Sequence, residues 1–188
     1  LIFIVRDITL QKEDQRKIAF LAYHDTLTRL PNRTYFFEKF DEALNEAKLN
    51  EKKLGVAIID LDDFKEINDD HGHLVGDQAL MHFVDHLRRV FTPPDVAVRF
   101  GGDEFAVLFP CVDSPQPIIE KFDQLRGLLE ENRLKAGDQS IAIRFSVGIG
   151  IFPDDGEDRV ALMRSADQAL YRVKRQGRNA LAFSDGQS

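Results

Sequence analysis

Two adjacent glycines, Gly101 and Gly102, separate two apolar runs and restrict the fold more than any other feature of the sequence. The runs cover residues 96–100 (VAVRF) and 103–109 (DEFAVLF). Glycine adopts positive φ without steric cost, and the tight turns that match the twist of paired strands need positive φ. The sequence therefore predicts an antiparallel β-hairpin with the two glycines as its turn.

The remaining chain alternates between helical and strand patterns. A short, almost continuous apolar run predicts a buried strand over residues 54–60, and β-branched residues predict another over 141–152. Four helices are predicted: residues 33–50 capped by Asn32, residues 74–91, residues 114–135 capped by Ser114, and a helix that begins near Arg159 and ends at Gly177. We therefore expect one α/β domain with a mixed central sheet flanked by helices, with the hairpin inserted in it.

The N-terminal residues have a different character. Residues 1–8 are typical of a strand, and residues 9–17 are polar and helix-forming. A strand that runs directly into a charged helix indicates the end of one domain and a linker. The chain does not begin with Met, so we expect it to be part of a longer protein.

Composition excludes several classes of partner. With Lys+Arg 25 against Asp+Glu 32, the formal net charge of −7 argues against a nucleic-acid polymer or an anionic membrane. A single cysteine, Cys111, excludes an intrachain disulfide framework and fits a reducing compartment, so we expect a cytoplasmic protein. No apolar run approaches the ~20 residues that cross a bilayer. This part of the chain is therefore not expected to insert in a membrane, although other regions of the full-length protein could attach it to one.

Charge is concentrated in two segments of opposite sign. Residues 60–70 hold six acids and one base, Lys65, whereas residues 159–180 hold six bases and one acid. Each segment alone is more typical of a solvated face than of a site. However, Asp60 closes a buried strand, and open α/β sheets bind ligands beyond the carboxyl ends of their strands.

The hairpin carries a second acidic pair, Asp103 and Glu104. If this pair lies beside Asp60, carboxylates from two elements converge on one point. Carboxylates in small number suit Mg²⁺ or Mn²⁺, which take further ligands from substrate phosphates. Phosphoryl transfer is the natural chemistry of such a site, and Lys65, Lys174 and Arg178 could neutralise the phosphates.

The segment 99–105 (RFGGDEF) resembles the signature of the GGDEF domain, the catalytic domain of diguanylate cyclases. Five further segments resemble motifs of the same family, in its order and spacing, over residues 22–183. They are residues 25–33 (DTLTRLPNR), 60–69 (DLDDFKEIND), 72–77 (GHLVGD), 146–150 (SVGIG) and 171–179 (YRVKRQGRN).

The resemblance implies a fold similar to the adenylyl cyclase catalytic domain and the polymerase palm. It implies condensation of two GTP molecules to cyclic di-GMP with loss of two pyrophosphates, in a homodimer whose subunits each hold one GTP. Two Mg²⁺ or Mn²⁺ ions per half-site would be bound by Asp60, the Leu61 carbonyl and Asp103, supported by Glu104. Asp103 is also implied as proton acceptor from the 3′-hydroxyl, and the sequence leaves open whether the metal activates that hydroxyl instead.

The same resemblance assigns the substrate contacts. Lys65 would stabilise the transition state, and Lys174 and Arg178 would hold the terminal phosphates. Guanine would be selected by Asn68 and Asp77, with Phe64 as a wall of the pocket and Gly101 and Gly102 allowing close approach of substrate. The plainer alternatives are that Asn68 is a turn residue and Asp77 a first-turn acid favoured by the helix dipole.

One family feature is degenerate. Many diguanylate cyclases carry an inhibitory Arg-x-x-Asp product site, and here Thr92 stands at the arginine position while Asp95 is present. The bidentate guanidinium contact is missing, so we expect no strong product inhibition through this site.

Two other functions compete with the enzyme: a GTP-binding regulatory module without turnover that controls an adjacent domain, and a dimerising signalling scaffold. Residues 1–9 resemble the end of a PAS sensor domain, which would leave residues 10–24 as a linker helix, residues 25–184 as the GGDEF domain and residues 185–188 as a tail. An upstream sensor in the same chain is then an expected partner.

Overall fold

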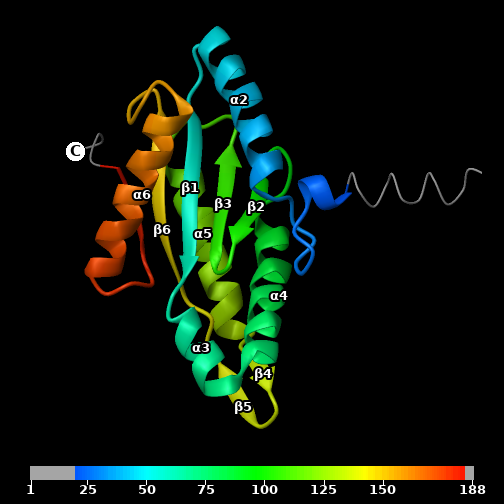
Figure 1. Cartoon of the computed structure of the whole chain (residues 1–188). Coiled ribbons are helices and arrows are strands. Elements are labelled where there is room, and N and C mark those ends of the chain that lie inside the picture. The colour runs from blue at the N-terminus through cyan, green and yellow to red at the C-terminus, as the bar shows by residue number, and fades with distance from the viewer. Residues whose placement is uncertain (1–19, 185–188) are drawn as a thin grey trace, which may run out of the picture.

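A five-stranded mixed sheet in the order β2-β3-β1-β6-β7 forms the centre of the molecule in this computed structural model, which describes residues 20–184 (Figure 1). Only the β6–β7 pair is parallel, and the other three pairs are antiparallel. The strands of this sheet are β1 (Leu54–Leu61), β2 (Val96–Gly101), β3 (Glu104–Phe109), β6 (Phe145–Phe152) and β7 (Leu181–Phe183). A separate small hairpin pairs β4 (Leu134–Ala136) with β5 (Gln139–Ile141).

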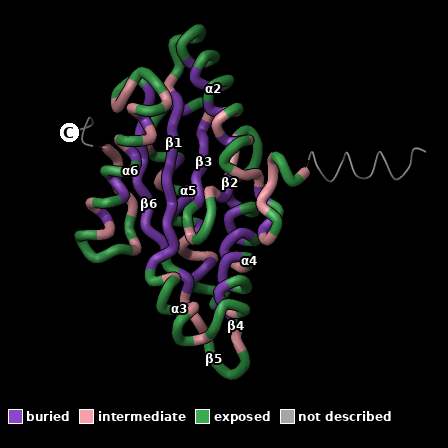
Figure 2. The backbone as a smooth tube through the Cα atoms, viewed as in Figure 1, coloured by how far each residue is buried: buried purple, intermediate pink, exposed green. Residues whose placement is uncertain are grey.

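Helices cover both faces of the sheet, so every residue of β1 is buried (Figure 2). Successive side chains of a strand point to opposite faces. Leu54, Val56 and Ile58 pack beneath α2 (Arg33–Leu49) and α6 (Arg159–Arg175). The alternate residues of β1 join the larger core beneath α4 (His73–Val90) and α5 (Gln116–Glu131). The predicted fold class, a mixed α/β sheet flanked by helices, is confirmed.

Glycines in β6 let α6 approach the sheet closely. A Cβ atom on Gly148 would lie 2.0 Å from the Ala166 carbonyl oxygen, and one on Gly150 would lie 2.9 Å from the Leu162 carbonyl oxygen. No side chain fits in those gaps, so the backbones pack directly. This close packing brings the C-terminal turn of α6 to the end of β1.

Several local predictions are confirmed. Asn32 caps α2 and accepts hydrogen bonds from the backbone N–H groups of Thr34 and Tyr35. The helices predicted over 74–91 and from Arg159 correspond to α4 and α6, and β1 matches its predicted range to within one residue.

Other local predictions are wrong at their boundaries. Ser114 does not cap α5, because Pro115 occupies the cap position with helical backbone angles and no side chain accepts a capping bond there. The chain between α5 and β6 forms the β4–β5 hairpin, so the predicted helix to residue 135 and the strand from residue 141 were both too long. The turn of the main hairpin is Gly102-Asp103, since Gly101 pairs with Glu104 across it.

A helix that the sequence did not predict, α3 (Phe64–His71), follows β1 directly. The strand and helix expected within residues 1–19 lie outside the described residues. In the part of the chain that the structure describes, no helix combines the length and hydrophobicity needed to cross a bilayer.

Candidate active site

The ends of β1 and β3 bring acidic residues from two elements together. Asp60 stands directly opposite Glu104 in the antiparallel register. Residues paired in this way share one face of the sheet, with Cβ atoms about 5 Å apart. The Leu61 N–H donates to the Asp103 carbonyl oxygen at 3.2 Å, which joins the hairpin turn to the end of β1.

A lysine from α6 compensates this negative charge. Lys174 Nζ lies 2.7 Å from Asp60 Oδ2. Burial raises the pKa of Asp60 above its usual value; the Lys174 ammonium opposes that rise, and the charges of Asp103 and Glu104 add to it. The end of β1 is therefore a place where a further cation is electrostatically favoured.

Arg99 holds the hairpin turn in place. Its Nε and Nη2 donate to the Gly102 carbonyl oxygen at 3.1 and 2.7 Å, and its Nη1 donates to Asp25 Oδ1 at 2.9 Å. Gly101 and Gly102 have φ values of 146° and 53°, so both glycines use backbone conformations that favour glycine, as the sequence indicated. Partial burial raises the pKa of Asp25, but hydrogen bonds from Thr28 and Arg99 outweigh it and bring that pKa below its usual value.

Asp62 joins the segment after α6 to the sheet, a role that the sequence pattern does not predict. This carboxylate is buried, and it accepts from Ser146 Oγ at 2.7 Å and from the Asn179 N–H at 2.9 Å. Arg178 and Asn179 both have positive φ, 64° and 46°. The fixed turn places Arg178 Nε 3.5 Å from Asp63 Oδ1. The sequence carries no signal for this role, because Asp62 lies beyond the end of β1 and its partner Asn179 is 117 residues away.

The predicted base-binding residues lie on α3 and α4. Asn68 is half-buried within α3 and Asp77 is exposed on α4, so Asn68 is not a turn residue and Asp77 lies beyond the first turn. Phe64 is half-buried and packs against the larger core, and Lys65 is exposed in the first turn of α3.

The donor chemistry at the end of β1 fits a hard divalent cation. Asp60, Asp103 and Glu104 supply carboxylates, and Leu61 supplies a backbone carbonyl, which are ligands of the type that Mg²⁺ and Mn²⁺ prefer. Within residues 20–184, no three His, Cys, Asp or Glu side chains lie close enough to hold an ion by themselves. Such a cation would therefore need further ligands from a bound substrate, which is usual for Mg²⁺ with phosphates.

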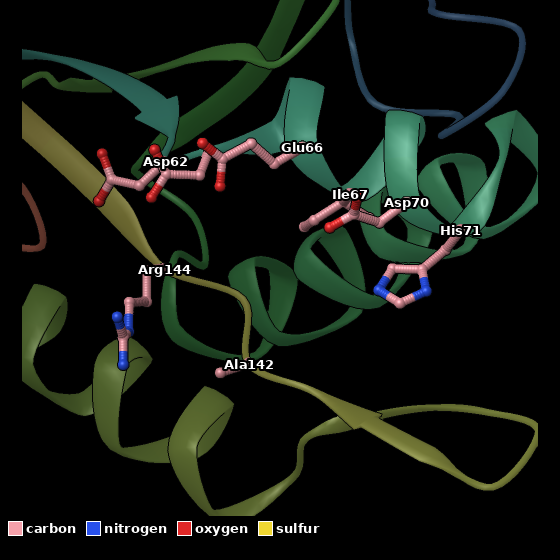
Figure 3. A pocket seen from close by; sticks show the side chains of 8 residues that line it. Asp62, Glu66, Ile67, Asp70, His71, Ala142 and Arg144 are labelled. Atoms are coloured by element: carbon pink, nitrogen blue, oxygen red, sulfur yellow. The ribbon is translucent and has the colours of Figure 1, made fainter.

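A cavity of about 280 Å³ opens beside this site, between α3 and the segment before β6 (Figure 3). Asp62, Glu66 and Asp70 line one side of it, and Arg144 reaches it from the opposite side. None of the predicted site residues lines this cavity, so it is a neighbour of the site and not the site itself.

The position of the degenerate product site holds an internal ion pair. The Asp95 carboxylate is almost fully buried and accepts a hydrogen bond from Lys121 Nζ. Burial raises the pKa of Asp95, and Lys121 opposes that rise. Thr92 is exposed and contributes its carbonyl oxygen to the Asp95 N–H.

The fold and the site together define an α/β domain that carries its acidic groups on a central strand and an adjoining hairpin. The chain belongs to the GGDEF family: residues 22–180 match the family described as diguanylate cyclase, GGDEF domain. Among curated proteins, it is 38% identical over 185 residues to an uncharacterized signaling protein of Caulobacter vibrioides, covering 97% of this chain and 22% of the relative. It is 33% identical over 174 residues to diguanylate cyclase TpbB of Pseudomonas aeruginosa, covering 93% of this chain and 40% of the relative.

A relative that is named for a different activity has a comparable sequence identity. Cyclic di-GMP phosphodiesterase PdeR of Escherichia coli is 37% identical over 174 residues, 92% of this chain and 25% of that protein. The chain thus spans between 22% and 40% of the length of these three relatives.

Solved structures show the same fold. The GGDEF domain of TpbB from Pseudomonas aeruginosa superposes with a TM-score of 0.82 at 34% identity, covering 87% of this chain and 95% of that one. The coiled coil and GGDEF domain of DgcB from Caulobacter crescentus, in complex with c-di-GMP, gives a TM-score of 0.84 at 31% identity, covering 94% and 93%.

Proposed function

We propose that this domain is a diguanylate cyclase that condenses two GTP molecules into cyclic di-GMP and two pyrophosphates. The observation that carries the proposal is the pairing of Asp60 with the hairpin acids next to Lys174, which gathers carboxylates and a cation at one strand end. The family membership and the cyclases among the relatives support it.

The residues divide the chemistry between them. In each of two steps, a GTP 3′-hydroxyl oxygen bonds to the α-phosphorus of the other GTP, and the bond from that phosphorus to the pyrophosphate oxygen breaks. Asp103 accepts the hydroxyl proton. Two Mg²⁺ or Mn²⁺ ions per half-site, held by Asp60, the Leu61 carbonyl, Asp103 and Glu104, would supply charge neutralisation and activation of that hydroxyl.

The substrate is held at both ends. Lys174 and Arg178 bind the terminal phosphates and Lys65 stabilises the charge that develops in the transition state. Asp77 accepts from guanine N1–H and the 2-amino group, with Asn68 beside it and Phe64 against the base. Adenine lacks those two donors and would leave the carboxylate unpaired.

The reaction needs two copies of the chain. Each subunit supplies one GTP, so a homodimer brings two half-sites face to face. We further propose that a sensor region upstream of residue 25 sets the geometry of this dimer. GTP as substrate assigns the domain to the cytoplasm.

A second candidate is a GTP-binding regulatory module that controls an adjacent domain without turnover. The similarity to PdeR, which is named a phosphodiesterase, favours it. The intact acidic pair after Gly101-Gly102 favours the cyclase.

The deciding experiment is incubation of the chain with GTP and Mg²⁺, with chromatographic detection of cyclic di-GMP. A fusion to a dimeric coiled coil supplies a forced dimer, and Asp103→Ala supplies the blank. Product from either form, absent from the blank, supports the cyclase. GTP binding without product in both forms identifies the regulatory module.

A further inference from the structure

Gly76 lies in α4 at a place where the backbone has no need of glycine. It is not among the residues with positive φ, and it belongs to the regular helix His73–Val90. Glycine in a helix costs about 1 kcal/mol relative to alanine. A reason other than backbone conformation must therefore explain its presence.

A side chain of α3 fills the space above Gly76. Helix α3 lies beside α4 and packs against it (Figure 1). A Cβ atom on Gly76 would lie 2.1 Å from Asn68 Oδ1, 2.9 Å from its Cγ and 3.4 Å from its Nδ2. All three of the nearest atoms thus belong to the amide of one residue. The missing side chain of Gly76 makes room for that amide.

The Asn68 amide is also oriented by two polar contacts. Its Nδ2 donates to the Phe64 carbonyl oxygen at 3.2 Å, and its Oδ1 lies 3.2 Å from His73 Nδ1. An amide has two N–H donors and two acceptor lone pairs, so one donor remains for a ligand. Gly76 therefore makes room for this amide on the helix that also carries Asp77.

We propose that Gly76 is a positioning residue for guanine recognition: its lack of a side chain holds the Asn68 amide beside Asp77. This inference deepens the proposed function and rests on it. Methyl addition at Gly76 meets the far end of the Asn68 side chain and not backbone, so the amide rotates away while α4 stays in place. The substitution is expected to damage nucleotide binding and spare the fold.

The test is a set of four variants measured by calorimetric titration with a non-hydrolysable GTP analogue and Mg²⁺, and with the matching ATP analogue. Gly76→Ala is compared with Gly127→Ala, a glycine of α5 whose added Cβ would meet nothing within 4 Å. Asn68→Ala and the double variant Asn68→Ala/Gly76→Ala complete a double-mutant cycle.

Gly76→Ala is expected to raise the Kd for the GTP analogue about tenfold, the effect of one lost hydrogen bond, and to narrow the preference for GTP over ATP. Its melting temperature should equal or exceed that of the wild type, and Gly127→Ala should bind like the wild type. In the Asn68→Ala background, Gly76→Ala should add no further loss.

Two results overturn the proposal while leaving the proposed function intact: wild-type affinity in Gly76→Ala, or an equal loss from Gly76→Ala with and without Asn68. A wild-type chain that binds neither analogue overturns this proposal and the proposed function together.

Discussion

Replacing Asp62 with alanine is expected to destabilise the fold and release the basic segment after α6. The carboxylate is 6% exposed and accepts two hydrogen bonds, from Ser146 Oγ at 2.7 Å and from the Asn179 N–H at 2.9 Å. Hydrogen bonds to a charged group contribute about 1.5 to 3 kcal/mol each. Removal of the desolvated carboxylate offsets part of that loss, so we expect the free energy of unfolding to fall by about 3 kcal/mol.

The Asp62→Ala substitution should also weaken nucleotide binding, in addition to lowering stability. Asn179 follows Arg178, and both residues need positive φ that the Asp62 bond helps to hold. Without the hydrogen bond to Asp62, Arg178 is no longer held opposite Asp63, and affinity for a GTP analogue should fall about tenfold or more. Urea denaturation measures the stability, and calorimetric titration at a temperature where circular dichroism shows the folded chain measures the affinity.

Two controls separate the contributions. Ser146→Ala removes one of the two bonds and should cost about 1.5 kcal/mol without weakening GTP binding. Asp62→Asn keeps an acceptor for the Asn179 N–H and should bind GTP better than Asp62→Ala. Wild-type stability and affinity in Asp62→Ala would contradict a role for Asp62 in holding Arg178, as would a Ser146→Ala variant that binds GTP as poorly as Asp62→Ala.

Three further outcomes are expected. Gly148→Ala should lower the free energy of unfolding by at least about 2 kcal/mol, because the new methyl group would lie 2.0 Å from the backbone of α6. Urea denaturation measures this change, and unchanged stability would contradict direct contact between the backbones of β6 and α6. Initial cyclase rates should not fall at micromolar cyclic di-GMP, since the Asp95 carboxylate pairs with Lys121; inhibition relieved by Asp95→Ala would count against this. Burial lowers the pKa of His82 below 6.5, so the unfolded chain binds more protons at this residue than the folded chain does just below that pH. His82 should therefore contribute a rise in the free energy of unfolding from pH 5 to 7, whereas the raised pKa values of Asp60 and Asp95 act in the opposite direction; a pH dependence that His82→Gln leaves unchanged would exclude this contribution.

Periodicity predicted the elements of the core because one face of each is buried. The apolar residues of β1 and those at helical spacing in α4 are stable only where they pack in a core. The wrong predictions concern elements that are too short or too polar to show such a pattern. The β4–β5 strands have three residues each, and α3 is a polar eight-residue helix anchored by Phe64 and Ile67.

Some residues of the candidate site could likewise be predicted from the sequence, and others could not. Asp60 and Asp103 follow from their places at a strand end and a turn, which local sequence determines. Asp62 could not be assigned, because its partner Asn179 is 117 residues away and its carboxylate resembles the exposed acids around it. The contact between Gly76 and Asn68 could not be predicted either, because Asn68 lies on a helix that the sequence did not predict.

The most direct test of the proposed function is product formation by a dimerised chain supplied with GTP and Mg²⁺. A diguanylate cyclase is expected to release cyclic di-GMP and pyrophosphate in a ratio of one to two, and Asp103→Ala is expected to release neither. A dimeric chain that binds GTP and still releases no cyclic di-GMP would contradict the proposed function.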